Sequence, residues 1–414
     1  MTIQELGAAA KTAAKNLALA GTAQKNRALE AIARKLTEEK AQWLSANEED
    51  VRAAKAAGMR PALLDRLTLT EARAASAAAG VLEVAALPDP IGQVDRMETR
   101  PNGLIIGRRR VPLGVIAIIF EARPNVAVDA AALCLKSGNA VILRGGKEAI
   151  ASNMAAARLM RSALKEAGLP EDCIALVEDT SRESARELMH LSEYVDVLIP
   201  RGGAQLIRTV AKEATVPVIR TGEGVCHVYI DKDADLDMGA RILFNAKCSR
   251  PSVCNAAECV LIHEAVAAEF LEKAVPLLDE KQVELRCDAA SLAILGERGI
   301  PATEEDWDTE YGDYILAVRV VKDMDEALEF ISAHGTNHSE SIVTKDYFAA
   351  QRFLNEVDAA AVYVNASTRF TDGGEFGLGA EIGISTQKMH ARGPMGLQEL
   401  TSHKFVIYGE GQVR

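Results

Sequence analysis

The chain has 414 residues, a net charge of −12 at pH 7, and 26% charged and 48% hydrophobic residues, which is ordinary for a soluble globular protein of two or three domains. No Lys/Arg block stands out, which disfavours a nucleic-acid partner, and no uncharged apolar run of 18 residues occurs, which disfavours a membrane span. The N-terminus lacks a signal-peptide layout, and the seven cysteines are odd in number, so we expect a cytoplasmic protein with free thiols.

The first ninety residues are predicted to form helices, because Leu29, Ile32 and Leu36 recur at helical spacing among charged residues. In residues 88–112 the helical spacing ends, and polar and apolar residues alternate in short runs on both sides of Asn102–Gly103. This pattern predicts an antiparallel hairpin with its turn at Asn102–Gly103. Alternating strands leave one face free, so we expect an arm that pairs with another subunit. The tail, residues 401–411, alternates in the same way and is expected to return to this arm as a strand.

From residue 115 onward, short apolar runs alternate with amphipathic stretches such as residues 153–168. The first set of runs is 115–120, 140–143, 173–177, 194–199 and 216–219. A second set begins near His227 and comprises 227–230, 259–262, 316–321, 341–343 and 360–365. Apolar strands separated by helices predict parallel sheets covered on both faces, here as two α/β domains divided near residue 226.

Ligands in such sheets bind beyond the carboxyl ends of the strands, so the residues that follow each strand are of interest. Two strands are followed by glycine turns, Arg144-Gly145-Gly146-Lys147 and Pro200-Arg201-Gly202-Gly203. Their backbone N–H groups suit a phosphate at a helix N-terminus. Neither turn matches G-x-G-x-x-G, and for each of them a plain strand-to-helix turn is an equally good interpretation.

Three cysteines, Cys248, Cys254 and Cys259, lie within residues 245–262. They are separated by five and four residues with no histidine among them, which disfavours a zinc site or a C-x-x-C redox pair. Cys259 begins an apolar run and is expected to be a core thiol. A nucleophile needs an exposed thiol near positive charge. Lys247 and Arg250 supply positive charge near both Cys248 and Cys254, so Cys254 is slightly favoured as the nucleophile and Cys248 remains a candidate.

The segment "FNAKCSRPSVCNAAECVLIHE" resembles the nucleophile segment of the aldehyde dehydrogenase superfamily. Blocks at 111–149, 230–240 and 362–386 resemble further motifs of that superfamily in the expected order. "IFEARPNV" and "HGTNHSESIVT" resemble its proline-biosynthesis branch, and the resemblance runs from about residue 5 to the end. It implies two Rossmann-like α/β/α domains and a small β oligomerisation arm. Residues 1–94 and 114–226 would form the cofactor domain, 227–400 the catalytic domain, and 95–113 with 401–414 the arm.

The resemblance implies an NADPH-dependent reduction of L-glutamyl 5-phosphate to L-glutamate 5-semialdehyde with release of phosphate. Cys254 aligns with the family nucleophile, whose thiolate attacks the acyl phosphate and leaves a thioester. Asn125 matches the asparagine of the oxyanion hole, with a turn residue as the alternative. Arg250 and Arg123, and less strongly Lys247, are candidates to hold the phosphate, with structural ion pairs as the alternative.

For the cofactor, Arg144 takes the place of the family lysine that reaches the adenosine ribose. Together with Lys147 it makes this strand end basic, which favours NADP over NAD. Glu310 falls where the family places a glutamate that holds the nicotinamide ribose. His334 and His338 are signature histidines of the branch, and His338 is assigned to the substrate with a structural hydrogen bond as the alternative. No metal is expected.

One departure from the superfamily concerns the water-activating glutamate of its hydrolytic members, which lies in E-L-G-G. Residues 218–227 read "VIRTGEGVCH", and Glu223 is shifted from the expected place. Loss of this base fits a thioester that is reduced rather than hydrolysed. A hydrolytic semialdehyde dehydrogenase, a thiol hydrolase and an inactive scaffold are the competing hypotheses. A homo-oligomer is expected, and glutamate 5-kinase is an expected partner because acyl phosphates are labile.

Overall fold

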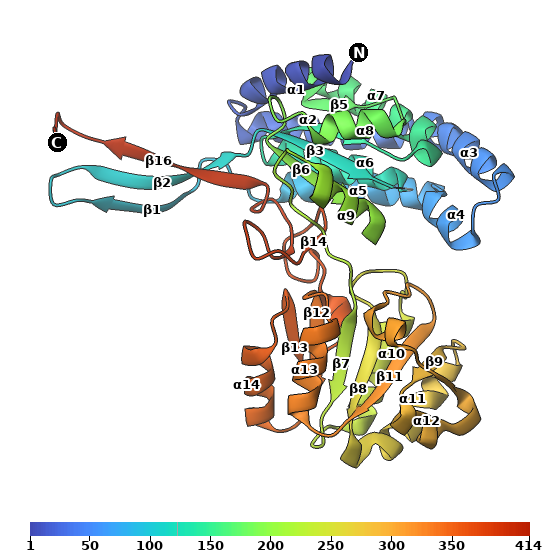
Figure 1. The fold of residues 1–414 in the computed structure, drawn as a ribbon. Helices are drawn as coiled ribbons and strands as arrows, with labels where there is room; N and C mark the ends of the chain where they lie inside the picture. Colours follow the sequence, from blue (N-terminus) through green and yellow to red (C-terminus); the bar gives the residue numbers. More distant parts are fainter. Residues whose placement is uncertain (122) are drawn as a thin grey trace. The chain divides into compact units, whose positions relative to one another are not determined.

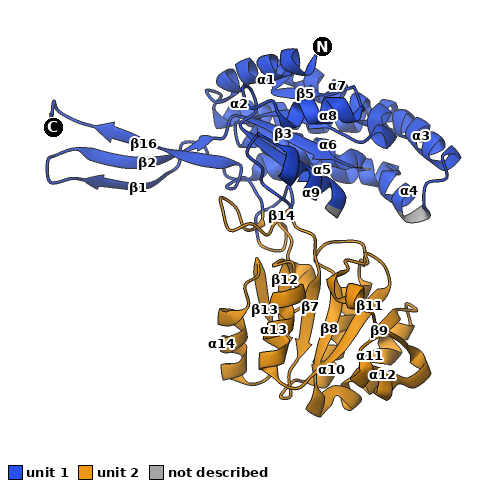
Figure 2. Cartoon of the chain, in the orientation of Figure 1, with its two compact units in different colours: residues 1–221, 377–383, 395–414 blue, residues 222–376, 384–394 orange. Residues whose placement is uncertain are grey.

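The computed structural model describes residues 1–121 and 123–414, apart from the side chains of residues 61, 62 and 204. The chain divides into two compact units (Figure 2). Unit 1 comprises residues 1–221, 377–383 and 395–414, and unit 2 comprises residues 222–376 and 384–394. The division therefore falls at 221/222, the arm belongs to unit 1, and residues 377–383 and 395–400 join unit 1 rather than the predicted catalytic domain.

The N-terminal part of unit 1 is helical, as the 3.6-residue periodicity predicts. Its helices are α1 (Ile3–Leu17), α2 (Thr22–Glu38), α3 (Lys40–Ala56), α4 (Pro61–Leu67) and α5 (Glu71–Ala86). Thr2 and Glu5 form a capping box at the start of α1, which satisfies two backbone N–H groups. Apolar residues on one face, such as Leu29 and Ile32 of α2, are buried.

Unit 1 contains a parallel sheet of four strands in the order β5-β4-β3-β6 (Figure 1). The strands are β3 (Val115–Phe120), β4 (Ala140–Arg144), β5 (Ile174–Leu176) and β6 (Val197–Arg201). Its remaining helices are α6 (Pro124–Lys136), α7 (Ile150–Glu166), α8 (Arg182–Met189) and α9 (Ala204–Glu213). Every residue of β3 is buried, as a strand covered on both faces requires.

The predicted strand at 216–219 differs from the structure. Only an isolated bridge joins Leu198 to Val218. Leu198 donates to the Pro217 carbonyl at 2.8 Å, but Pro217 has no N–H with which to extend a ladder. The apolar run is therefore a connection with its two ends, Val216 and Ile219, buried, and not a fifth strand.

A three-stranded antiparallel sheet in the order β1-β2-β16 forms the arm of unit 1 (Figure 1). The strands β1 (Val94–Thr99) and β2 (Ile105–Pro112) form the predicted hairpin. Gly103 occupies the turn with a φ of 85°, a conformation that favours glycine. The tail strand β16 (Thr401–Tyr408) pairs with the whole of β2. Both predicted pairings are confirmed.

Unit 2 is built on a parallel sheet of seven strands in the order β10-β9-β11-β8-β7-β12-β13. The strands are β7 (Cys226–Ile230), β8 (Ala257–His263), β9 (Glu284–Cys287), β10 (Gly299–Pro301), β11 (Ile315–Val321), β12 (Ser339–Val343) and β13 (Ala361–Val364). The helices are α10 (Leu236–Cys248), α11 (Ala267–Asp279), α12 (Ala289–Leu295), α13 (Met324–His334) and α14 (Tyr347–Glu356). The short strands β9 and β10, which lie at one end of the sheet order, have no long apolar run and were not predicted.

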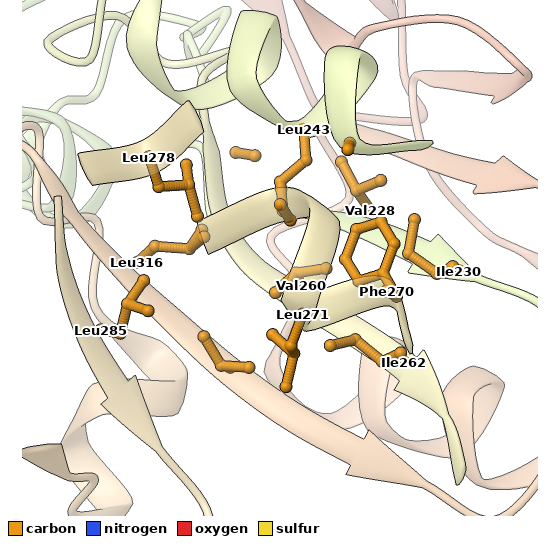
Figure 3. Close-up of a cluster of buried hydrophobic side chains, with 14 of the residues drawn as sticks. Val228, Ile230, Leu243, Val260, Ile262, Phe270, Leu271, Leu278, Leu285 and Leu316 are labelled. Carbon is orange, nitrogen blue, oxygen red and sulfur yellow. The ribbon is translucent and has the colours of Figure 1, made fainter. Parts of the chain in front are cut away.

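The strands of unit 2 send alternate residues into two separate cores. Val228 and Val260 pack with Phe270 of α11 on one face of the sheet (Figure 3). Tyr229 and Cys259 belong to the core on the other face. This alternation confirms a sheet covered on both sides and places Cys259, 1% exposed, in the core as predicted. Among the helices of the described residues, none has both the length and the apolarity to cross a membrane.

Candidate active site

Cys254 lies in the turn between α10 and β8, at the amino-terminal edge of the seven-stranded sheet. All seven cysteines fall in the described part of the chain, and the other six are buried. Cys248 ends α10 with its side chain in the core, and burial raises the pKa of its thiol to about 11. A thiol of this kind is protonated near neutral pH and shielded from a substrate. The structure therefore favours Cys254 over Cys248 as the nucleophile.

Residues 222–226 support the Cys254 turn at close range. A Cβ atom on Gly224 would lie 1.5 Å from the Cys254 carbonyl oxygen, so no side chain fits at this position. The buried Cys226 thiol donates to the same carbonyl, with 3.2 Å between Sγ and oxygen. The segment that replaces E-L-G-G thus fixes the backbone that carries the nucleophile.

His338 lies behind this turn and is fully buried. Its Nδ1 is 2.9 Å from the Ser339 hydroxyl and 3.8 Å from the Cys226 sulfur. Burial lowers the pKa of His338 to about 4, so the ring is neutral at pH 7 and offers no charge to a phosphate. These contacts of Nδ1 support the structural alternative, whereas the buried Nε2 has no hydrogen-bond partner among the described residues, so the contact with the substrate stays a prediction.

Lys247 is fully buried, and its ammonium lies 2.5 Å from the carboxylate of Glu258 on β8. Burial raises the pKa of Glu258 to about 7, and the Gly312 N–H donates to Glu258 at 3.2 Å. A buried ammonium that already has a carboxylate partner is unsuited to an incoming phosphate. The predicted phosphate contact of Lys247 is therefore replaced by a structural ion pair, which was the alternative.

The Lys247–Glu258 pair also fixes the loop that carries Glu310, since Gly312 belongs to that loop. Glu310 is exposed, and its contact with a cofactor stays a prediction. His334 lies at the end of α13, with its Nδ1 2.8 Å from Asp308. Across the described residues, no group of three or more His, Cys, Asp or Glu is placed to hold a metal ion.

Two residues near Cys254, Asn255 and Arg369, were not predicted from the sequence. After β13 the chain reverses at Asn365, which has a φ of 56°. It then runs back along β12, and the Ser339 and Thr371 hydroxyls come within 2.6 Å. Arg369 of this returning loop is hydrogen-bonded to the Asn255 side chain. The only sequence feature that pointed to Arg369 was its place in the block 362–386, which resembles a motif of the superfamily.

In unit 1, Asn125 and Arg123 lie where α6 begins after β3. Arg123 is the N-cap residue of α6 and is half-buried. The Asn125 side chain is exposed, and its Nδ2 donates to Asp129 at 3.0 Å. Burial raises the pKa of Asp129 to about 6. Because Asn125 and Arg123 belong to unit 1 and Cys254 to unit 2, the oxyanion and phosphate roles of these two residues stay predictions.

The turn after β4 forms a cradle of two glycines, in which other side chains fill the space that a Cβ atom would need. A Cβ atom on Gly145 would lie 2.1 Å from Asn153 Nδ2, and one on Gly146 would lie 2.1 Å from Glu148 Oε1. Asn153 is fully buried, and both its amide atoms lack a hydrogen-bond partner within the described residues. Buried polar groups normally have partners, so an open amide beside this cradle fits the polar adenosine end of a dinucleotide.

The two cations of the same turn differ in their surroundings. Arg144 is half-buried, and its Nη2 donates to the carbonyls of Thr180 and Ser181 at 2.8 Å each. This ties β4 to the loop before α8, and burial lowers the pKa of Arg144. Lys147 is exposed, so it is the better placed of the two for a ligand phosphate.

The second glycine turn, at Gly202 and Gly203, contains a carboxylate. The Gly203 N–H donates to Glu121 Oε2 at 2.9 Å, and a Cβ atom on Gly202 would lie 2.4 Å from the same oxygen. A phosphate at this turn would compete for the N–H group and be repelled by the negative charge. The structure thus speaks against a phosphate site here, and a strand-to-helix turn is the better interpretation.

Comparisons with known proteins identify the family of the chain. The family model "Aldehyde dehydrogenase family" matches residues 1–291. The gamma-glutamyl phosphate reductase of Carboxydothermus hydrogenoformans is 59% identical over 413 residues, which span 100% of this chain and 99% of that protein. The crystal structure of the gamma-glutamyl phosphate reductase of Thermotoga maritima has 48% identity and a TM-score of 0.97, with 100% of both chains covered.

An acetylating aldehyde dehydrogenase of Geobacillus thermoglucosidasius shares the fold, with a TM-score of 0.71, 18% identity, and 100% of this chain and 97% of that chain covered. The aldehyde dehydrogenase-like α/β fold predicted from the motifs is confirmed. The chain belongs to the aldehyde dehydrogenase family and, within it, to the gamma-glutamyl phosphate reductases.

Proposed function

We propose that the protein catalyses the NADPH-dependent reduction of L-glutamyl 5-phosphate to L-glutamate 5-semialdehyde, with release of phosphate, in proline biosynthesis. The observation that carries the proposal is the partly exposed Cys254, held in a rigid turn with the exposed Arg250 beside it in the chain. The name of the full-length relatives supports this choice of substrate.

In the first step, the Cys254 thiolate attacks the acyl carbon and forms a C–S bond. The bond between that carbon and the phosphate oxygen breaks, and phosphate leaves with the electron pair. Arg250 is positioned in sequence to stabilise this leaving anion, as Arg123 is on unit 1. The Asn125 amide donates an N–H to the oxygen that becomes negative in the tetrahedral intermediate.

The chemistry that a bound nicotinamide dinucleotide supplies is hydride transfer to the thioester carbon. Gly145, Gly146 and Asn153 would hold its adenosine end, where the buried Asn153 amide lacks a hydrogen-bond partner among the described residues. The exposed Lys147 binds the 2′-phosphate, which is the reason to prefer NADP over NAD. Arg144 shapes the adjoining loop through its two carbonyl contacts, and Glu310 is the candidate for the nicotinamide ribose.

Reduction is favoured over hydrolysis because residues 218–227 lack the E-L-G-G glutamate. In the same segment, Gly224 lies directly against the Cys254 carbonyl, where no side chain fits. A thioester that is protected from water keeps the activation delivered by the acyl phosphate.

The arm supports a homo-oligomer as part of the same proposal. Its strands carry large exposed apolar side chains, namely Val94, Met97, Ile105, Phe405, Ile407 and Tyr408. Both outer strands, β1 and β16, have an open edge in the sheet order, and such edges favour pairing with another chain. A labile acyl phosphate also makes contact with glutamate 5-kinase advantageous. The seven free thiols fit the cytoplasm.

The reverse reaction provides the test. Protein, L-glutamate 5-semialdehyde and NADP⁺ are mixed with and without inorganic phosphate, and NADPH formation is followed by absorbance. We expect sustained turnover only with phosphate, because phosphate must discharge the thioester. Turnover at the same rate without phosphate would identify a hydrolytic dehydrogenase, and no NADPH formation under either condition would support the thiol hydrolase.

A further inference from the structure

A second arginine lies against the turn that carries the nucleophile. We propose that Arg369, together with Arg250, binds the phosphate group that Cys254 displaces. The inference rests on the proposed function and assigns a substrate-binding residue within it. It concerns unit 2 only, since the turn 249–255 and the loop 366–371 both belong to that unit.

The guanidinium of Arg369 spans the nucleophile turn. Its Nη1 donates to the side-chain oxygen of Asn255, the residue that follows Cys254. Its Nε donates to the Ser249 hydroxyl at 3.1 Å, and Ser249 precedes Arg250. The cation is therefore tied to both ends of the short segment that contains Arg250 and Cys254.

This position is rigid, because Asn255 binds the same loop through its other groups. Asn255 is 4% exposed, and its Nδ2 donates to the carbonyls of Thr371 at 2.9 Å and Arg369 at 3.3 Å. The Thr368 hydroxyl donates to the Asn255 carbonyl at 2.7 Å. A group held in this way does not need to be ordered when the substrate arrives, which favours binding and orientation.

The charges around Arg369 favour an anion. Burial and then the charge of Arg250 lower the pKa of Arg369, while Asp372 and Cys254 oppose this shift. The Arg369 hydrogen bonds to Asn255 and Ser249 are made to neutral groups, so neither bond neutralises its positive charge, and Asp372 is the carboxylate that partly offsets it. Two neighbouring cations repel each other until an anion binds between them.

The phosphate is the better match among the anionic groups of the substrate. It is bonded to the carbon that Cys254 attacks, so it must lie next to the thiol during the reaction. A phosphate oxygen accepts strong hydrogen bonds from a guanidinium, and paired arginines match its multiple negative charge. The substrate α-carboxylate lies at the far end of the glutamyl chain from the reacting carbon and is the competing ligand.

The experiment measures the KM for phosphate and the KM for semialdehyde in the NADP⁺-dependent oxidation. We expect Arg369→Ala to raise the KM for phosphate about 10- to 100-fold and to leave the KM for semialdehyde within about twofold. Arg369→Lys keeps the charge and should recover part of the loss. Arg352→Ala, an exposed arginine of α14 with its own carboxylate partners, is the matched control and should behave as wild type.

A raised KM for semialdehyde with an unchanged KM for phosphate would overturn the inference in favour of the α-carboxylate. Equal changes in both constants would indicate a structural role only, and would also overturn it. If Arg369→Ala does not fold, Arg369→Lys decides by the same two constants. Wild-type protein that oxidises the semialdehyde without phosphate would overturn the proposed function itself, whereas a phosphate-dependent wild type with unaffected variants would overturn this inference alone.

Discussion

The two units place their candidate site residues at opposite edges of their sheets and hold them differently. In unit 2, Cys254 precedes β8 at the amino-terminal edge, and buried contacts from Gly224, Cys226 and Asn255 fix its turn. In unit 1, the candidates follow strands at the carboxyl-terminal edge, where Asn125 and Lys147 are exposed. A covalent nucleophile must be held within a narrow geometry, whereas a dissociable cofactor is suited to an exposed turn.

The largest effect should come from Cys254→Ala. Without the thiol no thioester forms, and we expect turnover to fall by at least about 10⁴-fold. Binding of NADPH, followed by fluorescence titration, should remain because the residues proposed to hold its adenosine end, Gly145, Gly146 and Lys147, lie in unit 1. Cys248→Ala should keep kcat within about threefold, since this thiol is buried. If Cys248→Ala is the inactive variant, the assignment of Cys254 as the nucleophile of unit 2 is wrong.

The second largest effect on kcat is expected at Gly224, which packs against the turn that carries Cys254. Gly224→Ala places a Cβ atom 1.5 Å from the Cys254 carbonyl, so the turn must move, and we expect kcat to fall by about 10²-fold or more. Gly80→Ala in α5 is the control, because a Cβ atom there meets open space, and it should stabilise the helix by about 1 kcal/mol. Wild-type kcat in Gly224→Ala would show that the turn is not held in this way.

The third effect is on stability against pH. The folded pKa of His338 is about 4 and its unfolded value is 6.5, so the unfolded chain binds the proton more tightly. The neutral His338 therefore contributes roughly 3 kcal/mol to the free energy of unfolding above pH 6.5, and this contribution is lost as the pH falls toward 4. His338→Gln should flatten that slope in urea unfolding at a series of pH values. An unchanged dependence of the free energy of unfolding on pH would mean that another group causes the loss of stability at acid pH.

The smallest effect is expected for Lys147→Ala in unit 1, on the KM for NADPH. Lys147→Ala should raise the KM for NADPH about tenfold and change the KM for NADH little, because only NADPH carries the 2′-phosphate. Lys165→Ala, a largely exposed lysine of α7, is the matched control. Equal changes for both cofactors would place Lys147 outside the 2′-phosphate site.

The features predicted best from the sequence are those set by local pattern. The apolar run at 115–120 became β3, and the alternating segments around Asn102–Gly103 and 401–408 became the arm, because strand periodicity depends on neighbouring residues. The run at 216–219 failed as a strand because Pro217 interrupts the ladder. Cys254 was identified by family motifs rather than by charge, since Cys248 has the same charged neighbours.

The site predictions that the structure speaks against failed because of partners on other elements of the fold. Lys247 is neutralised by Glu258, and the Gly203 N–H is occupied by Glu121, 82 residues earlier. Arg369 reaches the nucleophile turn only because the chain reverses at Asn365. Such pairings arise from tertiary structure, and one sequence without tertiary contacts does not specify them. The rule that ligands follow strands also directs attention away from Cys254, which precedes one.

The central claim is that Cys254 carries the acyl group, and mapping the acyl-enzyme tests it most directly. Protein, semialdehyde and NADP⁺ are combined without phosphate, the mixture is quenched in acid, and the peptides that contain each cysteine are sequenced by mass spectrometry. We predict a burst of one NADPH per active subunit and a glutamyl adduct on Cys254 that disappears when phosphate is added before quenching. An adduct on Cys248 or Cys226, or a burst without any adduct on Cys254, would contradict the account.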